Sequence, residues 1–400
     1  MIRIAYVTPR FVERPLDGWE MRLQQFQHVL GELSRDGLAI WDLSRGAACD
    51  PSGGAAPSRR ARAAPPARVS APKRLALLLA RLSPAYAARS LDGQRERLLR
   101  WLDASAVTDV VVVHPHGTEL VPELRRRGLR VFVDAHNVEI DVARELAAAA
   151  PSLLERLDAR VRLRILERRE RAFACANEVW LPSEADAARQ RALSGAALPV
   201  RCVPNAVDLS RYPPAARSPS LDVVFPGHFG YRPNADAARM LHERIMPRVR
   251  ETFPGARLVV VGRDPYGWAA EACRGPHAVV TGEVADAVPV LRGAAVVPVP
   301  LLSGSGTRFK ILEALALRLP VVTTALGCGG LAVADGEHVL IRPPGAFADA
   351  VVALLGDFER ACRLGERGRA LVEARYSWDG VREPVRAALL GAHHQLSARR

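Results

Sequence analysis

The sequence predicts an α/β protein made of two Rossmann-like, doubly wound domains that face each other across a cleft. In both halves of the chain, short runs of apolar and β-branched residues alternate with amphipathic helical stretches. Continuous apolar runs separated by helices are typical of a parallel sheet covered on both faces. The chain is also 400 residues long, which is more than one hydrophobic core usually holds. Two domains are therefore expected.

The first half supplies six predicted strands, with a helix near residues 19–35 between the first two. The strands are residues 2–8, 38–43, 109–114, 129–134, 177–181 and 200–203. Residues 45–72 are rich in Ala, Pro, Gly and Arg and offer little to a core, so we expect a flexible insertion there. Residues 73–82 follow as a short basic amphipathic helix. That helix is either an ordinary core-facing helix or one that contacts a membrane.

The alternation resumes after a Pro-rich stretch at residues 213–219. The predicted strands of the second half are residues 221–225, 256–261, 277–281, 294–299, 320–324 and 338–341. We therefore expect a first domain over residues 1–215 and a second over residues 216–375. The last segment, residues 376–400, is expected to form a helix that packs back on the first domain.

Composition narrows the classes of function. The formal net charge is +13, and Lys73 and Lys310 are the only lysines among 56 basic residues. A positive field favours anionic partners such as nucleotide sugars or an acidic membrane face. Nucleic acid is disfavoured as a partner, because no basic stripe is interleaved with aromatic residues.

Cysteine spacing and the length of the apolar runs predict a cellular compartment. The six cysteines are scattered without metal-ligand or disulfide-framework spacing, which favours reduced thiols. No run approaches the ~18 apolar residues of a membrane span, and the start of the chain reads as a strand rather than a signal peptide. We expect a cytoplasmic protein, with a peripheral position on the inner face of the membrane as the alternative.

The best candidate site follows the strand at residues 294–299, where a Gly-containing loop opens a helix near Thr307. The loop residues are Gly304, Ser305, Gly306 and Thr307. Glycine lets a backbone approach a ligand closely, and free N–H groups at a helix start bind phosphate. Lys310 and Glu313 are three residues apart and share one helix face. This pattern suits a diphosphate and a ribose, or else a capped surface helix that carries an ion pair.

These residues resemble a known family. Residues 304–316, followed by the LPVVTT of residues 319–324, resemble the donor-binding signature of the GT-B glycosyltransferases of retaining family 4, the glycosyl transferases group 1. Weaker matches follow in the family's order: PLDG at residues 15–18, DAHNVE at 134–139, VPNAVD at 203–208, FPG at 225–227 with PN at 233–234, VVVGR at 259–263 and VTGEV at 280–284.

The resemblance implies transfer of a sugar, with retention, from a nucleotide diphosphate donor bound by the second domain. Glu313 matches the second glutamate of the family's E-x7-E motif, which holds the donor ribose and is counted among the catalytic residues. Ser305 stands where the first glutamate is expected, so the identity of the sugar stays open. The cations available to the diphosphate are His228, Arg232, Arg263, Arg308 and Lys310.

The first domain is implied to bind the acceptor. His136 matches the family's histidine near the donor sugar, where it would act in catalysis; the alternative is a structural histidine. Asn137 and Glu139 accompany it in the same motif, and Asp17 and Gly18 lie in the loop after the first strand. The acceptor is a glycan, a lipid-linked sugar or a small molecule. The basic residues 58–82 make contact with a membrane an option.

No D-x-D pair occurs, so a metal-independent hexosyltransferase of glycan or polysaccharide biosynthesis is expected, with no cofactor beyond the nucleotide sugar as co-substrate. Cationic side chains and a helix start would stabilise the leaving diphosphate. Two alternatives stay open. One is a nucleotide-sugar 2-epimerase on the same fold, and the other is a non-catalytic protein that binds sugar nucleotides.

Overall fold

The computed structural model describes residues 2–9, 11–12, 15, 18–35, 37–49, 94–148, 153–195, 197–214, 219–304 and 308–397. The chain forms two compact units. The first comprises Met1–Pro15, Arg22–Pro204 and Arg382–Arg400, and the second comprises Leu16–Met21 and Asn205–Val381. The chain thus passes between units after residues 15, 21, 204 and 381, where the sequence led us to expect divisions after 215 and 375. Most of the predicted insertion and all of the helix predicted at residues 73–82 lie outside the described residues.

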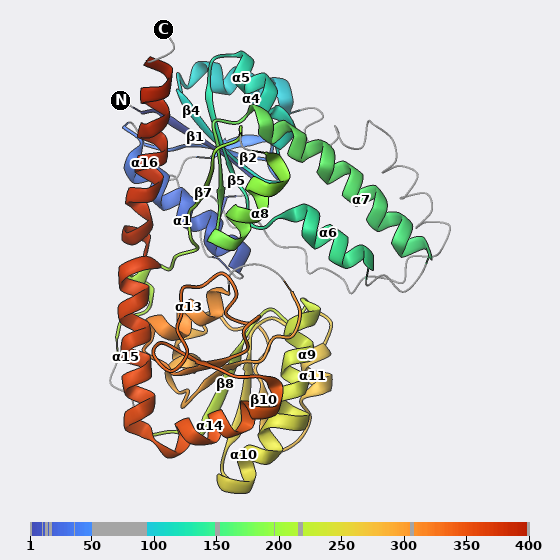
Figure 1. The fold of residues 1–400 in the computed structure, drawn as a ribbon, viewed down its shortest axis with the longest axis vertical. Coiled ribbons are helices and arrows are strands. Elements are labelled where there is room, and N and C mark those ends of the chain that lie inside the picture. Colours follow the sequence, from blue (N-terminus) through green and yellow to red (C-terminus); the bar gives the residue numbers. More distant parts are fainter. Residues whose placement is uncertain are drawn as a thin grey trace. The chain divides into compact units, whose positions relative to one another are not determined.

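The first unit is built on a sheet in the order β3-β2-β1-β4-β5-β6-β7 among the described residues (Figure 1). Its strands are β1 (Ile4–Thr8), β2 (Ala39–Asp42), β3 (Ala47–Cys49), β4 (Asp109–Val113), β5 (Arg130–Asp134), β6 (Glu178–Leu181) and β7 (Val200–Cys202). All neighbours are parallel except β2 and β3. The sequence predicted each parallel strand. It was wrong at residues 47–49, which pair with β2 instead of belonging to a flexible insertion.

Both faces of this sheet are covered, because side chains alternate along each strand. On one face, Phe26 of α1 (Gly18–Leu33) stacks on Trp180 with ring centroids 5.6 Å apart. On the other face, the valines of β4 and β5 pack in one core with leucines and alanines of three helices. These are α4 (Arg95–Ala104), α5 (Val121–Arg126) and α8 (Glu184–Ser194). The doubly wound arrangement predicted for this half is therefore present.

Two more helices precede β6. They are α6 (Glu139–Ala148) and α7 (Leu153–Arg171), which pack side by side (Figure 1). A 3-10 turn, Ala172–Cys175, ends α7, and another, Thr118–Leu120, follows β4.

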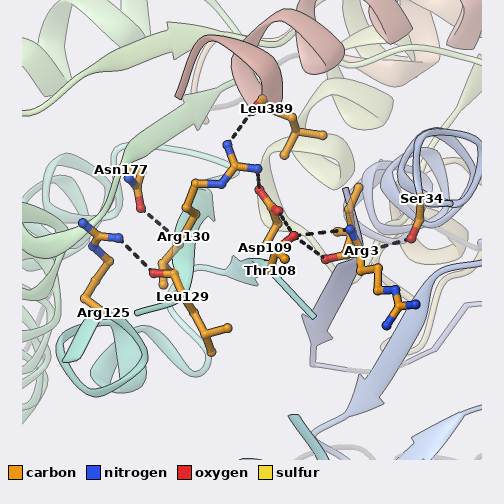
Figure 2. A network of polar contacts seen from close by, with 11 residues as sticks. Arg3, Ser34, Thr108, Asp109, Arg125, Leu129, Arg130, Asn177 and Leu389 are labelled. Atoms are coloured by element: carbon orange, nitrogen blue, oxygen red, sulfur yellow. Dashed lines mark hydrogen bonds and ion pairs between the residues drawn. The ribbon is translucent and has the colours of Figure 1, made fainter. Parts of the chain in front are cut away.

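Buried polar contacts hold the C-terminal helix α16 (Trp378–Ser397) to the first unit at the amino ends of the strands (Figure 2). The guanidinium of Arg130 forms an ion pair with Asp109 and donates to the backbone oxygen of Leu389, 2.6 Å away. The hydroxyl of Thr108 donates to the second oxygen of Asp109 at 2.5 Å. Arg130 is 3% exposed and Asp109 is 0% exposed. The pair therefore ties β4, β5 and α16 together.

The second unit has two three-stranded parallel sheets, β10-β9-β8 and β11-β12-β13, among the described residues. A bridge between Val223 and Val296 joins β8 to the segment that enters β11. The strands are β8 (Asp222–Pro226), β9 (Arg257–Val261), β10 (Ala278–Val280), β11 (Val297–Val299), β12 (Val321–Thr323) and β13 (Leu340–Ile341). Each strand predicted from the sequence is present.

Helices alternate with these strands. They are α9 (Arg232–Met240), α10 (Met246–Thr252), α11 (Trp268–Ala272), α12 (Val288–Arg292), α13 (Phe309–Ala316), α14 (Phe347–Gly356) and α15 (Phe358–Arg375). A π-helical turn, Leu241–Ile245, joins α9 to α10. The predicted α/β fold class is thus confirmed in both units. Among the described residues, no helix has the length and apolar character needed to cross a membrane.

Candidate functional site

Lys310 lies in the first turn of α13, at the carboxyl end of β8 in the second unit. Its ammonium donates to the side-chain oxygen of Asn234 at 2.7 Å and lies 4.4 Å from the ring centroid of Phe225. A Cβ added at Gly227 would come within 3.2 Å of the same nitrogen. The amine therefore lies directly beneath the loop after β8, at a point where the backbone carries no side chain to cover it.

The surroundings make Lys310 an unusual cation. Burial lowers its pKa to about 7, and neighbouring Arg308 adds to the decrease, while Glu313 opposes it. No carboxylate pairs with the amine among the described ion pairs. Burial disfavours the charged form of an amine, and a nearby anion favours it. Binding of an anion would therefore stabilise the ammonium form of Lys310.

Glu313 lies one turn further along α13, and its carboxylate accepts a hydrogen bond from the hydroxyl of Tyr212 at 2.7 Å. Burial raises the pKa of Glu313, whereas the bond from Tyr212 and the charges of Arg211 and Lys310 lower it. Tyr212 is itself buried, and its backbone oxygen accepts from Arg369 of α15 at 2.7 Å. The carboxylate is therefore fixed by a neutral donor and has no ion pair within 4 Å among the described residues, and the residue as a whole is half-buried.

The loop before α13 is held by Arg308. This buried side chain donates to the backbone oxygen of Gly304 at 2.7 Å, and Tyr231 hydrogen-bonds to it from the loop after β8. Burial lowers the pKa of Arg308. Gly304 has φ +100°, and a Cβ there would come within 2.3 Å of the hydroxyl of Tyr231. Only glycine fits this position.

The other donor-side residues divide into three groups. Ser305, Gly306 and Thr307 lie outside the described residues. The helix begins at Phe309, with Arg308 preceding it, instead of near Thr307. His228 lies in the loop after β8, where its backbone oxygen accepts a hydrogen bond from the side-chain amide of Asn234 at 2.9 Å.

The remaining two cations already have partners. Arg232 donates to Asp236 at 3.0 Å and lies 5.3 Å from the ring of Trp268. Arg263 lies 3.9 Å from Glu283. Both therefore differ from Lys310, which forms no ion pair with a carboxylate within the described ranges.

In the first unit, His136 follows β5 and lies against a buried ion pair. Its Nε2 is 3.6 Å from Asp134, which pairs with Arg22 of α1 at 2.7 Å. Arg22 also donates to the backbone oxygen of Val203 at 2.9 Å. Burial would raise the pKa of Asp134, but Arg22 and then His136 lower it below its usual value. The carboxylate is thus charged, and it can orient His136.

The other acceptor-side residues lie in two places. Asn137 donates to Glu139 at 3.4 Å, and burial raises the pKa of Glu139. Gly18 groups with the second unit, where a Cβ on it would come within 2.9 Å of the ring of Phe309. Asp17 lies outside the described residues. Gly18 was predicted from the sequence on the acceptor side, whereas in the structure it belongs to the second unit and lies beside α13.

Three residues near α13 contact the candidate site but were not predicted as site residues from the sequence: Tyr212, Asn234 and Tyr231. Asn234 was noted only as part of a motif, and no local signal marks the two tyrosines. Each acts through a contact with a residue at least 70 positions away in the sequence. Within the described residues, no group of three or more His, Cys, Asp or Glu side chains is arranged to hold a metal ion.

Solved structures identify the fold. The chain aligns over its whole length with sucrose-phosphate synthase from Thermosynechococcus elongatus, with 100% of both chains covered, 19% identity and a TM-score of 0.67. It also aligns with the Anabaena protein HepE in complex with UDP-glucose, with 100% of both chains covered, 11% identity and a TM-score of 0.62. The fold is therefore GT-B, with two Rossmann-like domains.

Sequence comparison adds a family match. Residues 220–357 match the family model "Glycosyl transferases group 1". A phosphatidyl-myo-inositol mannosyltransferase from Mycobacterium leprae is 31% identical over 195 residues, which are 46% of this chain and 51% of the relative. A GDP-mannose-dependent alpha-(1-6)-phosphatidylinositol monomannoside mannosyltransferase from Mycobacterium tuberculosis is 30% identical over 211 residues, 46% of this chain and 54% of the relative.

These matches span about half the length of the mycobacterial relatives. The resemblance to group 1 glycosyl transferases recognised from the motifs is confirmed, and it is carried by the part of the chain that contains Lys310 and Glu313.

Proposed function

We propose that the protein is a glycosyltransferase that moves a sugar from a nucleotide diphosphate donor to an acceptor hydroxyl. One observation carries the proposal. Lys310 and Glu313 lie on the same face of α13, one beneath the glycine loop after β8 and the other held by Tyr212. In open α/β sheets, ligands bind beyond the carboxyl ends of the strands, which is where both side chains lie.

The two side chains suit the two parts of such a donor. The ammonium of Lys310, which pairs with no carboxylate in the described part of the chain, would bind the diphosphate and stabilise the charge that develops on it as the sugar leaves. The carboxylate of Glu313 would accept hydrogen bonds from the ribose hydroxyls. Arg308 would add a second positive charge near the phosphates, and Tyr231 would hold it in place.

Transfer with retention completes the proposal. The leaving phosphate oxygen would take the proton of the acceptor hydroxyl on the same face of the sugar, so no covalent intermediate with the enzyme is needed. The first unit would bind the acceptor, and His136 would donate or accept a hydrogen bond at the sugar. No metal ion and no further cofactor are required in this scheme. The pathway we propose is the synthesis of a glycan, a polysaccharide or a lipid-linked sugar.

The relatives suggest which donors to test. The M. tuberculosis mannosyltransferase is named as dependent on GDP-mannose, and HepE was solved with UDP-glucose. Both M. leprae and M. tuberculosis relatives act on phosphatidylinositol compounds by name. A lipid-linked acceptor at the inner face of the cytoplasmic membrane is therefore our first choice. Residues 58–82, for which the sequence suggests such a contact, lie wholly outside the described residues.

Calorimetric titration with GDP-mannose and UDP-glucose tests the proposal. Glu313→Ala should weaken binding of the productive donor about 10- to 100-fold, because hydrogen bonds from a charged group to the ribose are lost. Glu366→Ala, which removes an exposed carboxylate of α15, is the control and should bind as the natural protein does. Glu313→Gln keeps an acceptor for Tyr212 and separates ribose binding from folding. Equal donor affinity in all variants would refute the site.

A further inference from the structure

Helix α7 of the first unit exposes an almost purely cationic face. The exposed residues of its described part are Arg156, Leu157, Arg160, Arg164, Arg168 and Arg171. The arginines are spaced by four, four, four and three residues, so they fall within about 120° of the helix circumference and extend about 22 Å along the axis. Ala159 and Val161 are buried on the other side. We refer to the five arginines as the α7 arginine row.

Four members of the row have no carboxylate partner among the described residues. No ion pair joins Arg160, Arg164, Arg168 or Arg171 to a carboxylate of the described residues. Glu167 lies within the same arc but is partly buried. Burial raises the pKa of Glu170 to about 7, and it interacts with Gln190 of α8, away from the row. Four or more positive charges are therefore displayed together on one side of the helix.

Helix α15 shows that this pattern is not a general result of the chain's arginine content. It has almost the same length, and it also exposes four arginines, namely Arg360, Arg363, Arg367 and Arg375. Three exposed glutamates accompany them, and one of these, Glu359, lies 3.4 Å from Arg363. Mixed charge is what a solvated helix face normally shows. The charged residues at the exposed positions of the described part of α7 are all arginines, and this difference from α15 indicates a binding partner.

We propose that the α7 arginine row binds an anionic lipid surface and thereby holds the first unit at the membrane. A straight, convex row of guanidinium groups matches a flat layer of phosphate headgroups, and guanidinium binds phosphate through paired hydrogen bonds. Leu157, which is 42% exposed, lies on the same face and can enter the boundary between headgroups and acyl chains.

The composition of the face favours lipid over nucleic acid. Arginine can contact guanine as well as phosphate, but proteins also use Asn or Gln for adenine edges and aromatic rings for unpaired bases. The exposed positions of the described part of α7 hold no Asn, Gln or aromatic residue. A sugar nucleotide is too short to engage a row about 22 Å long. The inference is independent of the donor site on α13.

Vesicle co-sedimentation of the full chain tests the proposal. The natural protein should bind phosphatidylcholine vesicles that contain phosphatidylglycerol, bind pure phosphatidylcholine weakly, and dissociate as salt rises. Replacing Arg160, Arg164, Arg168 and Arg171 with Gln should weaken binding to the anionic vesicles by up to about 1000-fold, at about 1 kcal/mol per arginine. The matched control replaces Arg360, Arg363, Arg367 and Arg375 with Gln, and it should bind within a few-fold of the natural protein.

Three results would overturn the proposal. The first is equal loss of binding in both quadruple variants, which would indicate net charge alone. The second is full binding by the α7 variant, which would assign the contact to another segment. The third is stronger α7-dependent binding to random-sequence duplex DNA than to the vesicles. Donor titration of the α7 variant keeps the two proposals apart, since GDP-mannose or UDP-glucose affinity should not change.

Discussion

Two buried arginine–aspartate pairs lie at opposite ends of the same sheet. Arg130 and Asp109 meet at the amino ends of β4 and β5, and Arg22 and Asp134 meet at the carboxyl end of β5. The aspartates are fully buried in both cases. The pairs differ in what else they contact.

The pair at the amino end contacts structural groups. Its partners include the backbone of Leu389 in α16 and the hydroxyl of Thr108 (Figure 2). The pair at the carboxyl end holds the backbone of Val203 and stands beside His136. The same interaction therefore fixes a helix at one end and orients a titratable side chain at the other. This follows from the architecture, since the carboxyl ends of parallel strands are where ligands bind.

The largest expected effect is at the amino end. Arg130→Ala leaves the charge of Asp109 buried without its partner, so the free energy of unfolding should fall by about 3–5 kcal/mol. Urea unfolding followed by circular dichroism measures this. Donor affinity of the folded protein should not change. Replacing both partners, Arg130→Met with Asp109→Leu, should restore much of the stability, and a loss below about 1 kcal/mol for Arg130→Ala would show that the pair does not hold α16.

At the carboxyl end, stability and activity should fall together. Asp134→Asn keeps the shape of the side chain but weakens its bond from Arg22, which should cost about 2 kcal/mol of unfolding free energy. It also removes the charge that orients His136, so kcat should fall about tenfold, which corresponds to loss of one hydrogen bond of about 1.4 kcal/mol in the transition state. Steady-state kinetics with the productive donor measures this. An unchanged kcat would show that the pair of Arg22 and Asp134 has only a structural role, like the pair of Arg130 and Asp109.

The third prediction concerns Lys310, which pairs with no carboxylate of the described residues. Lys310 has a pKa of about 7 in the free protein, and a bound diphosphate should raise that pKa by favouring the ammonium. Donor affinity should therefore be highest below pH 7 and should fall as pH rises above 7, by up to about tenfold per pH unit. Calorimetry across this range measures the slope.

Variants of Lys310 serve as controls for that slope. Lys310→Arg stays charged and should bind the donor with little dependence on pH between 7 and 9. Lys310→Met should bind weakly at every pH. A slope that persists in either variant would assign the titration to another group, and a flat profile in the natural protein would contradict the environment found for the amine.

Most strands were predictable from the sequence because they are apolar, β-branched runs, and the central ones are buried on both faces. Residues 109–113 are an example: the run DVVVV became a strand with every residue buried. The short strand Ala47–Cys49 was missed because its residues are small and two of the three are exposed, so only pairing with β2 makes it a strand. A local sequence pattern therefore predicts a buried strand well, but it predicts poorly which short segment pairs with the edge of a sheet.

The candidate site was predictable where it is contiguous. Lys310 and Glu313 stand three apart on one helix, and that spacing alone puts them on one face. Their partners could not be predicted in the same way. Tyr212 lies 101 residues from Glu313, and Asn234 lies 76 residues from Lys310. A hydrogen bond between such distant residues depends on how the strands and helices pack, which no local pattern encodes.

The sequence by itself thus determined the fold class, the order of the strands along the chain and the helix that carries the donor-side charges, because periodicity and spacing are local properties. Only the tertiary structure decided which charges are matched. It paired Arg22, Arg130, Arg232 and Arg263 with carboxylates, and it left the amine of Lys310 beside an amide and a phenyl ring. The physical reason is that the state of a buried charge is set by the groups folded against it, and these come from segments far apart in the chain.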